Sequence, residues 1–184
     1  LKVAKLGNPI LRQVAKQVNL KDLAEQQAQL QGFIDDMIDT MREEDGIGLA
    51  APQVNRSLQI VVLEYENNER YPGELSIPLT VLVNPELSDY GVEKALGWES
   101  CLSLSDFRGL VPRYTSVTLK AYNRKGGKIE KRATGFEAVV LQHEIDHLHG
   151  KVFLDRMEDM TQLAYQEEFE EFWLKKKPFC KMER

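Results

Sequence analysis

The residues His143-Glu144-Ile145-Asp146-His147 have the form H-E-x-x-H, a spacing that can hold a metal ion. On a helix, His143 and His147 share one face, roughly 5–6 Å apart at Cβ, so both imidazoles can reach one ion. Glu144 lies beside that face and can carry a proton for water at the metal. The alternative is a surface helix that happens to hold two histidines. All three histidines of the chain, however, fall within residues 143–149, so we predict metal-dependent chemistry here.

A catalytic metal site of this kind needs a third protein ligand, and the sequence offers three options. An extended motif would place a histidine three residues after Gly150, but Phe153 stands there and cannot bind a metal. Cys101 is another option, giving one sulfur and two nitrogen ligands with an open fourth position. The remaining option is a glutamate from a later helix. The candidates are Glu167, Glu168, Glu170 and Glu171. Spacing alone leaves the cysteine and the glutamates open.

The helix that must carry the motif extends back to Thr134-Gly135 and ends near Gly150, because glycine suits the left-handed residue after a helix. Phe136, Val139 and Val140 fall on the same helical face as the two histidines. Core packing is the ordinary interpretation of these side chains. Because they lie one or two turns from the metal, we also predict that they line an apolar substrate pocket. Other faces are apolar as well, so we predict that helix 136–148 is buried.

A second stretch, Asp45 to Gln53, contains small residues that let a backbone approach another group closely. It is not a phosphate loop, because it lacks Gly-Lys-Ser/Thr and no strand obviously precedes it. A packing loop is its ordinary interpretation. If it faces the metal, Gln53 could donate its amide hydrogens to an oxyanion, while Ile47 and Gly48 present backbone groups to a peptide.

The remaining periodicity predicts the elements around these segments. Residues 22–43 and 160–177 carry helical apolar stripes. A short helical segment follows Asn8-Pro9, and residues 151–154 form a short strand or extended piece. We predict strands at 58–65, 79–83 (ended by Asn84-Pro85), 90–97, 116–122 and 128–133, the last two joined as a hairpin. The predicted fold is one α+β domain over residues 1–184, with short antiparallel strands packed around helix 136–148 and the other two helices outside.

Composition restricts the partners that we expect. The chain has 184 residues, a net charge of −5 and 42% hydrophobic residues, which suggests a globular protein and no direct nucleic-acid partner. No apolar run approaches the roughly 20 residues that span a bilayer, so no membrane partner is expected. Cys101 and Cys180 are too few for a disulfide framework, and residues 1–5 lack a signal-peptide pattern. We therefore expect a cytoplasmic protein, with Cys180 as a bystander.

Three segments together resemble the peptide deformylase family. They are residues 46–53 (GIGLAAPQ), residues 99–103 (ESCLS) and residues 142–148 (QHEIDHL) followed by Gly150. Their order and separation are similar to those of the family, and the resemblance covers roughly residues 5–157. It implies an enzyme that removes the N-formyl group from the N-terminal formyl-methionine of new bacterial and organellar polypeptides, releasing formate. The implied partners are nascent chains, met at the ribosome, in a bacterial cytosol or an organelle.

The resemblance also implies a role for each site residue. Cys101, His143 and His147 would hold one divalent metal, usually ferrous iron in that family, with zinc, nickel or cobalt as replacements. Glu144 would be the general acid/base. The Gln53 side chain and the Leu102 backbone N–H would form the oxyanion hole. The walls of the methionine pocket would be Ile47, Phe136, Val139 and Val140.

Two positions depart from the family pattern. Ser100 stands where the family usually has glycine, and Ser105 where it usually has proline. Neither change removes a ligand or the proton carrier. Both could alter the rate, the metal that is bound and the substrate preference, as expected of a second deformylase copy with altered selectivity. Glu99 and Arg113 could pair to hold the Cys101 segment, or could be independent surface charges. The functional alternatives are a zinc peptidase with a glutamate ligand and a binding protein without activity.

Overall fold

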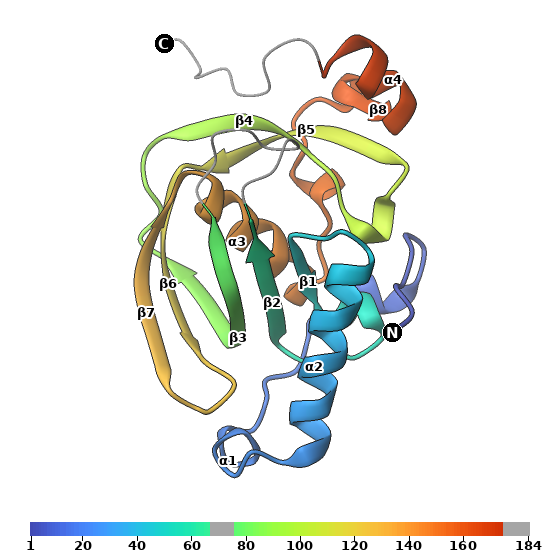
Figure 1. Cartoon of the computed structure of the whole chain (residues 1–184). Helices are drawn as coiled ribbons and strands as arrows, with labels where there is room; N and C mark the ends of the chain where they lie inside the picture. Colours follow the sequence, from blue (N-terminus) through green and yellow to red (C-terminus); the bar gives the residue numbers. More distant parts are fainter. Residues whose placement is uncertain (67–75, 175–184) are drawn as a thin grey trace.

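The computed structural model of the chain describes residues 1–66 and 76–174; Cys180 and residues 175–177 of the predicted last helix lie outside this part. The fold is mixed α/β, with antiparallel sheets and a few helices (Figure 1). The helices are α1 (Leu20–Ala24), α2 (Ala28–Glu43), α3 (Gly135–Leu148) and α4 (Gln166–Phe172). The strands are β1 (Gly48–Ala50), β2 (Ile60–Tyr65), β3 (Ile77–Ser88), β4 (Lys94–Glu99), β5 (Phe107–Tyr114), β6 (Ser116–Tyr122), β7 (Lys128–Thr134) and β8 (Leu163–Tyr165).

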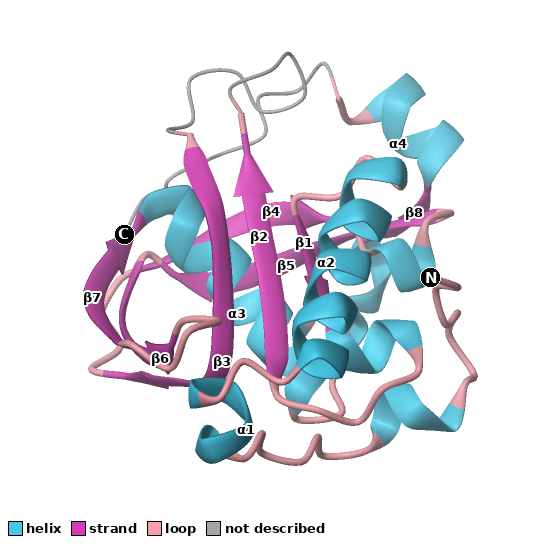
Figure 2. Cartoon of the chain, turned by 60° about the horizontal axis from the view of Figure 1, so that its bottom comes forward, coloured by secondary structure: helices cyan, strands magenta, loops and turns pink. Residues whose placement is uncertain are grey.

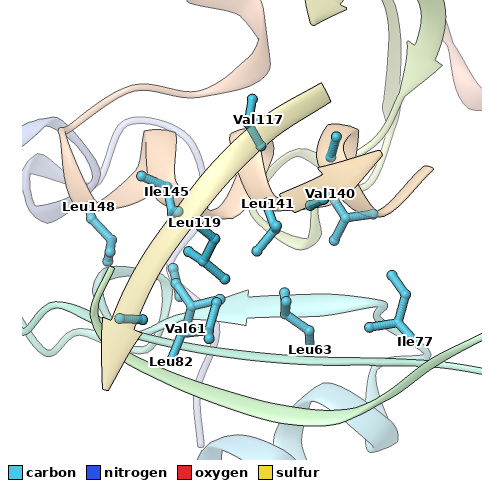
Figure 3. Close-up of a cluster of buried hydrophobic side chains, with 14 of the residues drawn as sticks. Val61, Leu63, Ile77, Leu82, Val117, Leu119, Val140, Leu141, Ile145 and Leu148 are labelled. Carbon is cyan, nitrogen blue, oxygen red and sulfur yellow. The ribbon is translucent and has the colours of Figure 1, made fainter. Parts of the chain in front are cut away.

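The strands form one sheet in the order β1-β2-β3-β6-β7 and a second in the order β4-β5-β8. Helices α2 and α3 cover opposite faces of the larger sheet (Figures 1 and 2). Alternate residues of β2 point to opposite faces. Val61 and Leu63 join the cluster with α3, whereas Ile60 and Val62 join the cluster with α2. Figure 3 shows the first cluster, in which Leu141 of α3 faces these strands. Each fully buried side chain of this kind contributes about 1.5–3 kcal/mol to folding.

Helix α3 begins after Thr134 and ends at Leu148, as the sequence predicts. Gly150 has a φ of 69°, and a Cβ there would lie 2.7 Å from backbone atoms of Arg12, so only glycine fits this helix end. Every residue from 140 to 148 is buried, including the polar ones. Polar groups in such a helix need partners inside the protein, and these partners build the site described below.

The predicted helix over residues 22–43 is wrong in its continuity. It is divided into α1 and α2, because Gln26 has a φ of 50°, which a continuous helix does not allow. Asn19 starts α1 separately by accepting a hydrogen bond from the backbone N–H of Lys21 at 2.9 Å. Apolar periodicity did not detect this break, since both helices bury residues against the same cluster. The short helical segment after Asn8 is a 3₁₀ helix limited to Pro9–Arg12.

The predicted helix over residues 160–177 begins too early: residues 160–165 are not α-helical, whereas residues 166–172 are. A 3₁₀ turn (Met160–Gln162) leads into β8, and α4 begins only after Tyr165. Strand β8 pairs with β5, where Leu163 lies opposite Gly109, and the rings of Phe107 and Tyr165 lie 4.9 Å apart. Pairing with a distant strand therefore overrides the local helical pattern.

Other boundaries also differ from the predictions. Strand β3 does not end at Asn84-Pro85: Asn84 has a φ of 49°, the register shifts between Val83 and Glu86, and the strand continues to Ser88. The predicted strand over 90–97 starts later, as β4, and residues 153–156 form a 3₁₀ helix rather than a strand. Strands β1 and β5 were not predicted. The β6–β7 hairpin is confirmed. Among the described residues, no helix combines the length and apolar character of a membrane span.

Candidate active site

Three predicted ligands come together at one point of the structure. Cys101 lies two residues after the end of β4, and α3 supplies His143 and His147, which lie on one face of the helix. Their ligand atoms all lie within 4.8 Å of one another, and Cys101 Sγ is 3.3 Å from His147 Nε2. In the part of the chain that the structure describes, the glutamates of α4 do not join this group. The geometry therefore favours the cysteine over a glutamate as the third candidate ligand.

The donor set fits a divalent metal ion. One thiolate and two imidazoles suit a tetrahedral site with one open position. Although burial opposes ionisation, the His147 and His143 imidazoles hold the pKa of the Cys101 thiol well below its usual value, which favours the thiolate form that binds metals. His147 Nδ1 is buried without a hydrogen-bond partner among the described residues. His143 contacts Glu99 Oε2 through Nδ1 at 2.8 Å, which leaves its other nitrogen for the ligand group.

A buried ion network supports His143 from behind. Glu99, the last residue of β4, accepts hydrogen bonds from Arg113 Nε at 2.7 Å and Nη2 at 3.1 Å. Burial opposes the charge on Glu99, but Arg113 and His143 lower its pKa to about 2. Arg113 also donates to Asp146 at 2.6 Å, and Asp146 accepts a second guanidinium, from Arg156. The sequence left open whether Glu99 and Arg113 pair or are independent surface charges, and the structure shows the pair. Asp146 and Arg156 were missed, although Asp146 lies inside the H-E-x-x-H motif itself.

Glu144 is buried beside the ligands, with no hydrogen-bond partner for Oε2 in the described part of the chain. Burial raises the pKa of this carboxyl group above its usual value. The side chain has room only because residue 48 is glycine: a Cβ on Gly48 would lie 2.4 Å from Glu144 Oε1. This close approach explains the need for glycine at the first position of β1.

Gln53 lies in the 3₁₀ helix Ala51–Val54, which follows β1. Its Oε1 accepts a hydrogen bond from the backbone N–H of Ala50 at 2.8 Å, which orients the amide. Its Nε2 then points to Cys101 Sγ at 3.4 Å and to Ser103 Oγ at 3.3 Å. An amide donor is therefore aimed at the ligand group. Leu102 follows Cys101 and begins a second 3₁₀ turn, Leu102–Leu104.

The N-terminal segment forms hydrogen bonds with both the Gln53 segment and the Leu102 segment. The sequence did not predict these contacts. The backbone N–H of Ala4 donates to the Gln53 carbonyl at 2.7 Å, and that of Leu6 donates to the Ser103 carbonyl at 3.0 Å. Lys5 Nζ donates to the Leu102 carbonyl at 2.9 Å and to Ser105 Oγ at 3.3 Å. Ser105, one of the two departures from the family pattern, is thus a partner of this segment.

A cavity of about 600 Å³ opens onto the ligand group. Its walls include all the residues predicted for substrate binding: Ile47, Gly48, Phe136, Val139 and Val140. They also include Gln53, Cys101, Leu102, His143 and Glu144, together with Ser100. His147 is buried next to Cys101. Helix α4 contributes a further wall, which no sequence pattern predicted.

Comparison with known proteins identifies the family. The polypeptide deformylase family model matches residues 1–163. Peptide deformylase 1 of Bordetella pertussis is 43% identical over 165 residues, covering 90% of this chain and 92% of that protein. Peptide deformylase 1 of Nitrosomonas europaea is 43% identical over 163 residues, covering 89% of this chain and 90% of that protein.

Solved structures agree with the sequence comparison. A crystal structure of the class I type b peptide deformylase from Acinetobacter baumannii, bound to Met-Ala-Ser, has a TM-score of 0.81 and 39% sequence identity. The match covers 85% of this chain and 98% of that one. The chain described here therefore belongs to the peptide deformylase family of enzymes.

Proposed function

We propose that this enzyme removes the formyl group from the N-terminal formyl-methionine of newly made polypeptides and releases formate. The observation that carries the proposal is the meeting of Cys101, His143 and His147 with Glu144 and Gln53 at one end of a partly apolar cavity. The Acinetobacter baumannii relative was crystallised with Met-Ala-Ser, the peptide that deformylation of formyl-Met-Ala-Ser would leave. A similar cavity in this chain would accept the same kind of peptide.

The metal would be held by Cys101 Sγ and one ring nitrogen each of His143 and His147. Bound there, a divalent ion would polarise the attacking water and the formyl oxygen. We propose ferrous iron, following the family resemblance, with zinc, nickel or cobalt as replacements, since a thiolate and two imidazoles suit each of these ions. Glu99 would keep His143 in the orientation and tautomer that a ligand needs.

The chain's own residues would carry the proton and stabilise the developing charge. Glu144 would take a proton from water while the water oxygen attacks the formyl carbon. It would then give this proton to the methionine nitrogen as the C–N bond breaks. Gln53 Nε2 and the Leu102 backbone N–H would donate to the oxyanion. One such donor contributes about 2.7–4 kcal/mol to transition-state stabilisation. The fixed orientation of the Gln53 amide supports this role, because a preoriented donor needs no rearrangement during the reaction.

The apolar walls of the cavity would select methionine. Phe136, Val139 and Val140 lie along one face of α3 beside the ligands, and Ile47, in the loop before β1, also lines the cavity. An unbranched thioether side chain fills an irregular apolar pocket well. Gly48 would present its backbone to the peptide while leaving room for Glu144.

We propose that helix α3 is the centre of the fold, with the strands packed around it and α2 and α4 outside, and that residues 1–184 form a single domain. The burial of residues 140–148 supports the first part. We place the reaction in the bacterial cytosol, because the two relatives named above are bacterial. Nascent chains at the ribosome would be the substrates.

Formate release from formyl-Met-Ala-Ser by anaerobically prepared protein, with metal analysis, tests the proposal. In Glu144→Gln, one equivalent of metal should remain while turnover falls about 10²–10⁴-fold, the usual contribution of a general acid/base. In Cys101→Ala, metal should be lost. Metal retention in Cys101→Ala would favour a glutamate ligand instead. Full activity in Glu144→Gln would exclude Glu144 as the general acid/base. Binding of the peptide without formate release would favour the alternative of a binding protein without activity.

A further inference from the structure

Lys5 contacts the turn that carries a proposed oxyanion donor, although it is not among the residues that line the cavity. Its Nζ donates a hydrogen bond to the Leu102 carbonyl at 2.9 Å and another to Ser105 Oγ at 3.3 Å. The turn is the 3₁₀ helix Leu102–Leu104, which follows Cys101. An ammonium group has three N–H donors. Two of the donors of Lys5 are therefore used on the segment next to a candidate metal ligand.

Three successive carbonyl groups in this segment accept hydrogen bonds. The Cys101 carbonyl accepts one within the turn itself, at 2.8 Å, and the Ser103 carbonyl accepts one from the Leu6 backbone N–H at 3.0 Å. The Leu102 carbonyl between them is bound by Lys5. A trans peptide group is planar and points its N–H away from its own carbonyl. Holding the carbonyls on both sides of Leu102 therefore holds the direction of the Leu102 N–H.

The Lys5 side chain extends from a backbone that is itself anchored. The Ala4 N–H donates to the carbonyl of Gln53, the other proposed donor, at 2.7 Å, and Gln53 Nε2 lies 3.3 Å from Ser103 Oγ. Val3 and Ala4 are buried, whereas Lys5 is exposed. Of the bonds to the three carbonyls described above, that of Lys5 is the one made by a side chain. A substitution can therefore remove it without changing the backbone.

We propose that Lys5 is a positioning residue for the reaction, which holds the Leu102 peptide group in the direction needed to donate to the oxyanion. The inference rests on the proposed function, since it requires an oxyanion that the Leu102 N–H stabilises. Lys5 belongs neither to the ligand group nor to the cavity wall, so it would act only through the turn. Direction matters because such a donor is effective only at about 2.7–3.1 Å from the oxyanion.

Ser105 gives this positioning role a second contact. The family pattern usually has proline at this position, and a proline side chain has no hydrogen-bond acceptor. The hydroxyl group of Ser105 therefore provides Lys5 with an acceptor that the usual residue lacks. Removing this hydroxyl should weaken the hold on the turn while leaving the bond to the Leu102 carbonyl in place.

Lys5→Met tests the proposal, because it keeps a long side chain and removes its donors. In metal-loaded enzyme, kcat for formyl-Met-Ala-Ser should fall about five- to fiftyfold, less than the 10²–10³-fold expected when an oxyanion donor is lost, because Leu102 N–H would be displaced and not removed. The KM should stay within about twofold, since the contact matters only once the oxyanion forms. Binding of the product Met-Ala-Ser, which lacks the formyl oxygen, should likewise be unchanged. Lys5→Arg should restore most of kcat, because a guanidinium also donates to a carbonyl.

Lys2→Met is the matched control. It removes the same charge from the same segment, and the exposed Lys2 side chain takes no part in the bonds to the turn. Its kcat should stay within about twofold of the parent value. Ser105→Ala should lower kcat less than Lys5→Met does, and should add little to the effect of Lys5→Met, because the contact is then already lost. Metal analysis and unfolding midpoints would show that each variant is folded and loaded.

The outcomes separate the two proposals. If the metal-loaded parent releases no formate, the proposed function fails. If the parent is active and Lys5→Met keeps full kcat, or if Lys5→Met and Lys2→Met lose kcat equally, the positioning role is refuted while the proposed function stands. A loss that Lys5→Arg does not restore, or that matches a loss of metal, would also refute it. Should Lys5→Met fail to fold, full kcat in Ser105→Ala together with a loss in Lys2→Met would overturn the proposal.

Discussion

Glu144 and Gly48 show how closely single residues are fitted at this site. The Glu144 carboxyl group occupies the space that a side chain at position 48 would need. Its position therefore depends on a residue nearly one hundred positions away in the chain, which makes room for it by lacking a Cβ. A substitution at position 48 therefore tests how much displacement of the Glu144 carboxyl group the reaction tolerates.

Gly48→Ala should lower kcat/KM about a hundredfold, because a displacement of about 1 Å in a catalytic group can have that effect. The metal content should not change, since the three atoms nearest the added methyl group all belong to Glu144 and not to the candidate ligands. Formate release and metal analysis measure the two effects. Gly32→Ala is the control: a Cβ there meets nothing within 4 Å, so activity should be retained. Normal activity in Gly48→Ala would mean that Glu144 tolerates movement.

At the scale of elements, buried ion pairs join the strands of the smaller sheet to α3. Arg113 of β5 bonds Glu99 at the end of β4 and Asp146 of α3. Through Glu99 the same network reaches His143. One buried cation therefore sets the relative position of the three elements that supply the candidate ligands and their support.

Arg113→Met should lower the free energy of unfolding by about 3–5 kcal/mol, because it leaves the buried carboxylates of Glu99 and Asp146 with one cation fewer. Urea unfolding of the metal-loaded protein would measure this loss. Lys120→Met breaks an exposed pair with Glu130 at 3.5 Å and should cost only about 0–1 kcal/mol. Equal losses in the two variants would contradict a structural role for the buried network.

A second pair joins α2 to β2 and predicts a pH dependence. Arg42 donates to both carboxylate oxygens of Glu64, at 2.6 and 2.9 Å, and this hydrogen bonding lowers the pKa of Glu64 below 4.5. A carboxylate with a lowered folded-state pKa stabilises the protein above its unfolded pKa, and this contribution is lost as pH falls through the folded value.

Glu64→Gln should therefore be slightly less stable than the parent near pH 7, with the difference disappearing as the pH drops below 4.5. The effect should be small because the Arg42 side chain is exposed and that of Glu64 is partly exposed. Urea midpoints at several pH values would show the convergence. A difference that stays constant down to pH 3 would exclude this linkage.

For the whole molecule, the ligand group is a junction between the two sheets. Cys101 follows the smaller sheet, whereas α3 packs on the larger one. A bound metal would cross-link these parts and stabilise the folded state by mass action, by about 4 kcal/mol at a free concentration one thousand times Kd.

Removal of the metal with a chelator should consequently lower the Tm of the protein, and adding zinc, nickel or cobalt should restore it. Thermal unfolding followed by circular dichroism would measure both changes. Cys101→Ala, which lacks one candidate ligand, should show a much smaller response to the chelator. The same Tm with and without metal would contradict the cross-linking role.

What the sequence determined by itself was local. The four-residue spacing of His143 and His147 placed both on one helical face, Gly150 marked the helix end, and the 116–133 hairpin followed from alternation and its glycines. The family resemblance rested on three such segments. Each depends on interactions between residues close in the chain, which a pattern can record.

Only the tertiary structure decided which distant residues meet. It placed the Cys101 sulfur beside the histidines, showed Gly48 clearing a space for Glu144, and made Leu163–Tyr165 a strand against β5 although their local pattern was helical. It also made α4 part of the cavity wall. The physical reason is the same in each case: these contacts join segments far apart in sequence, so their energies depend on packing and pairing that no local pattern contains.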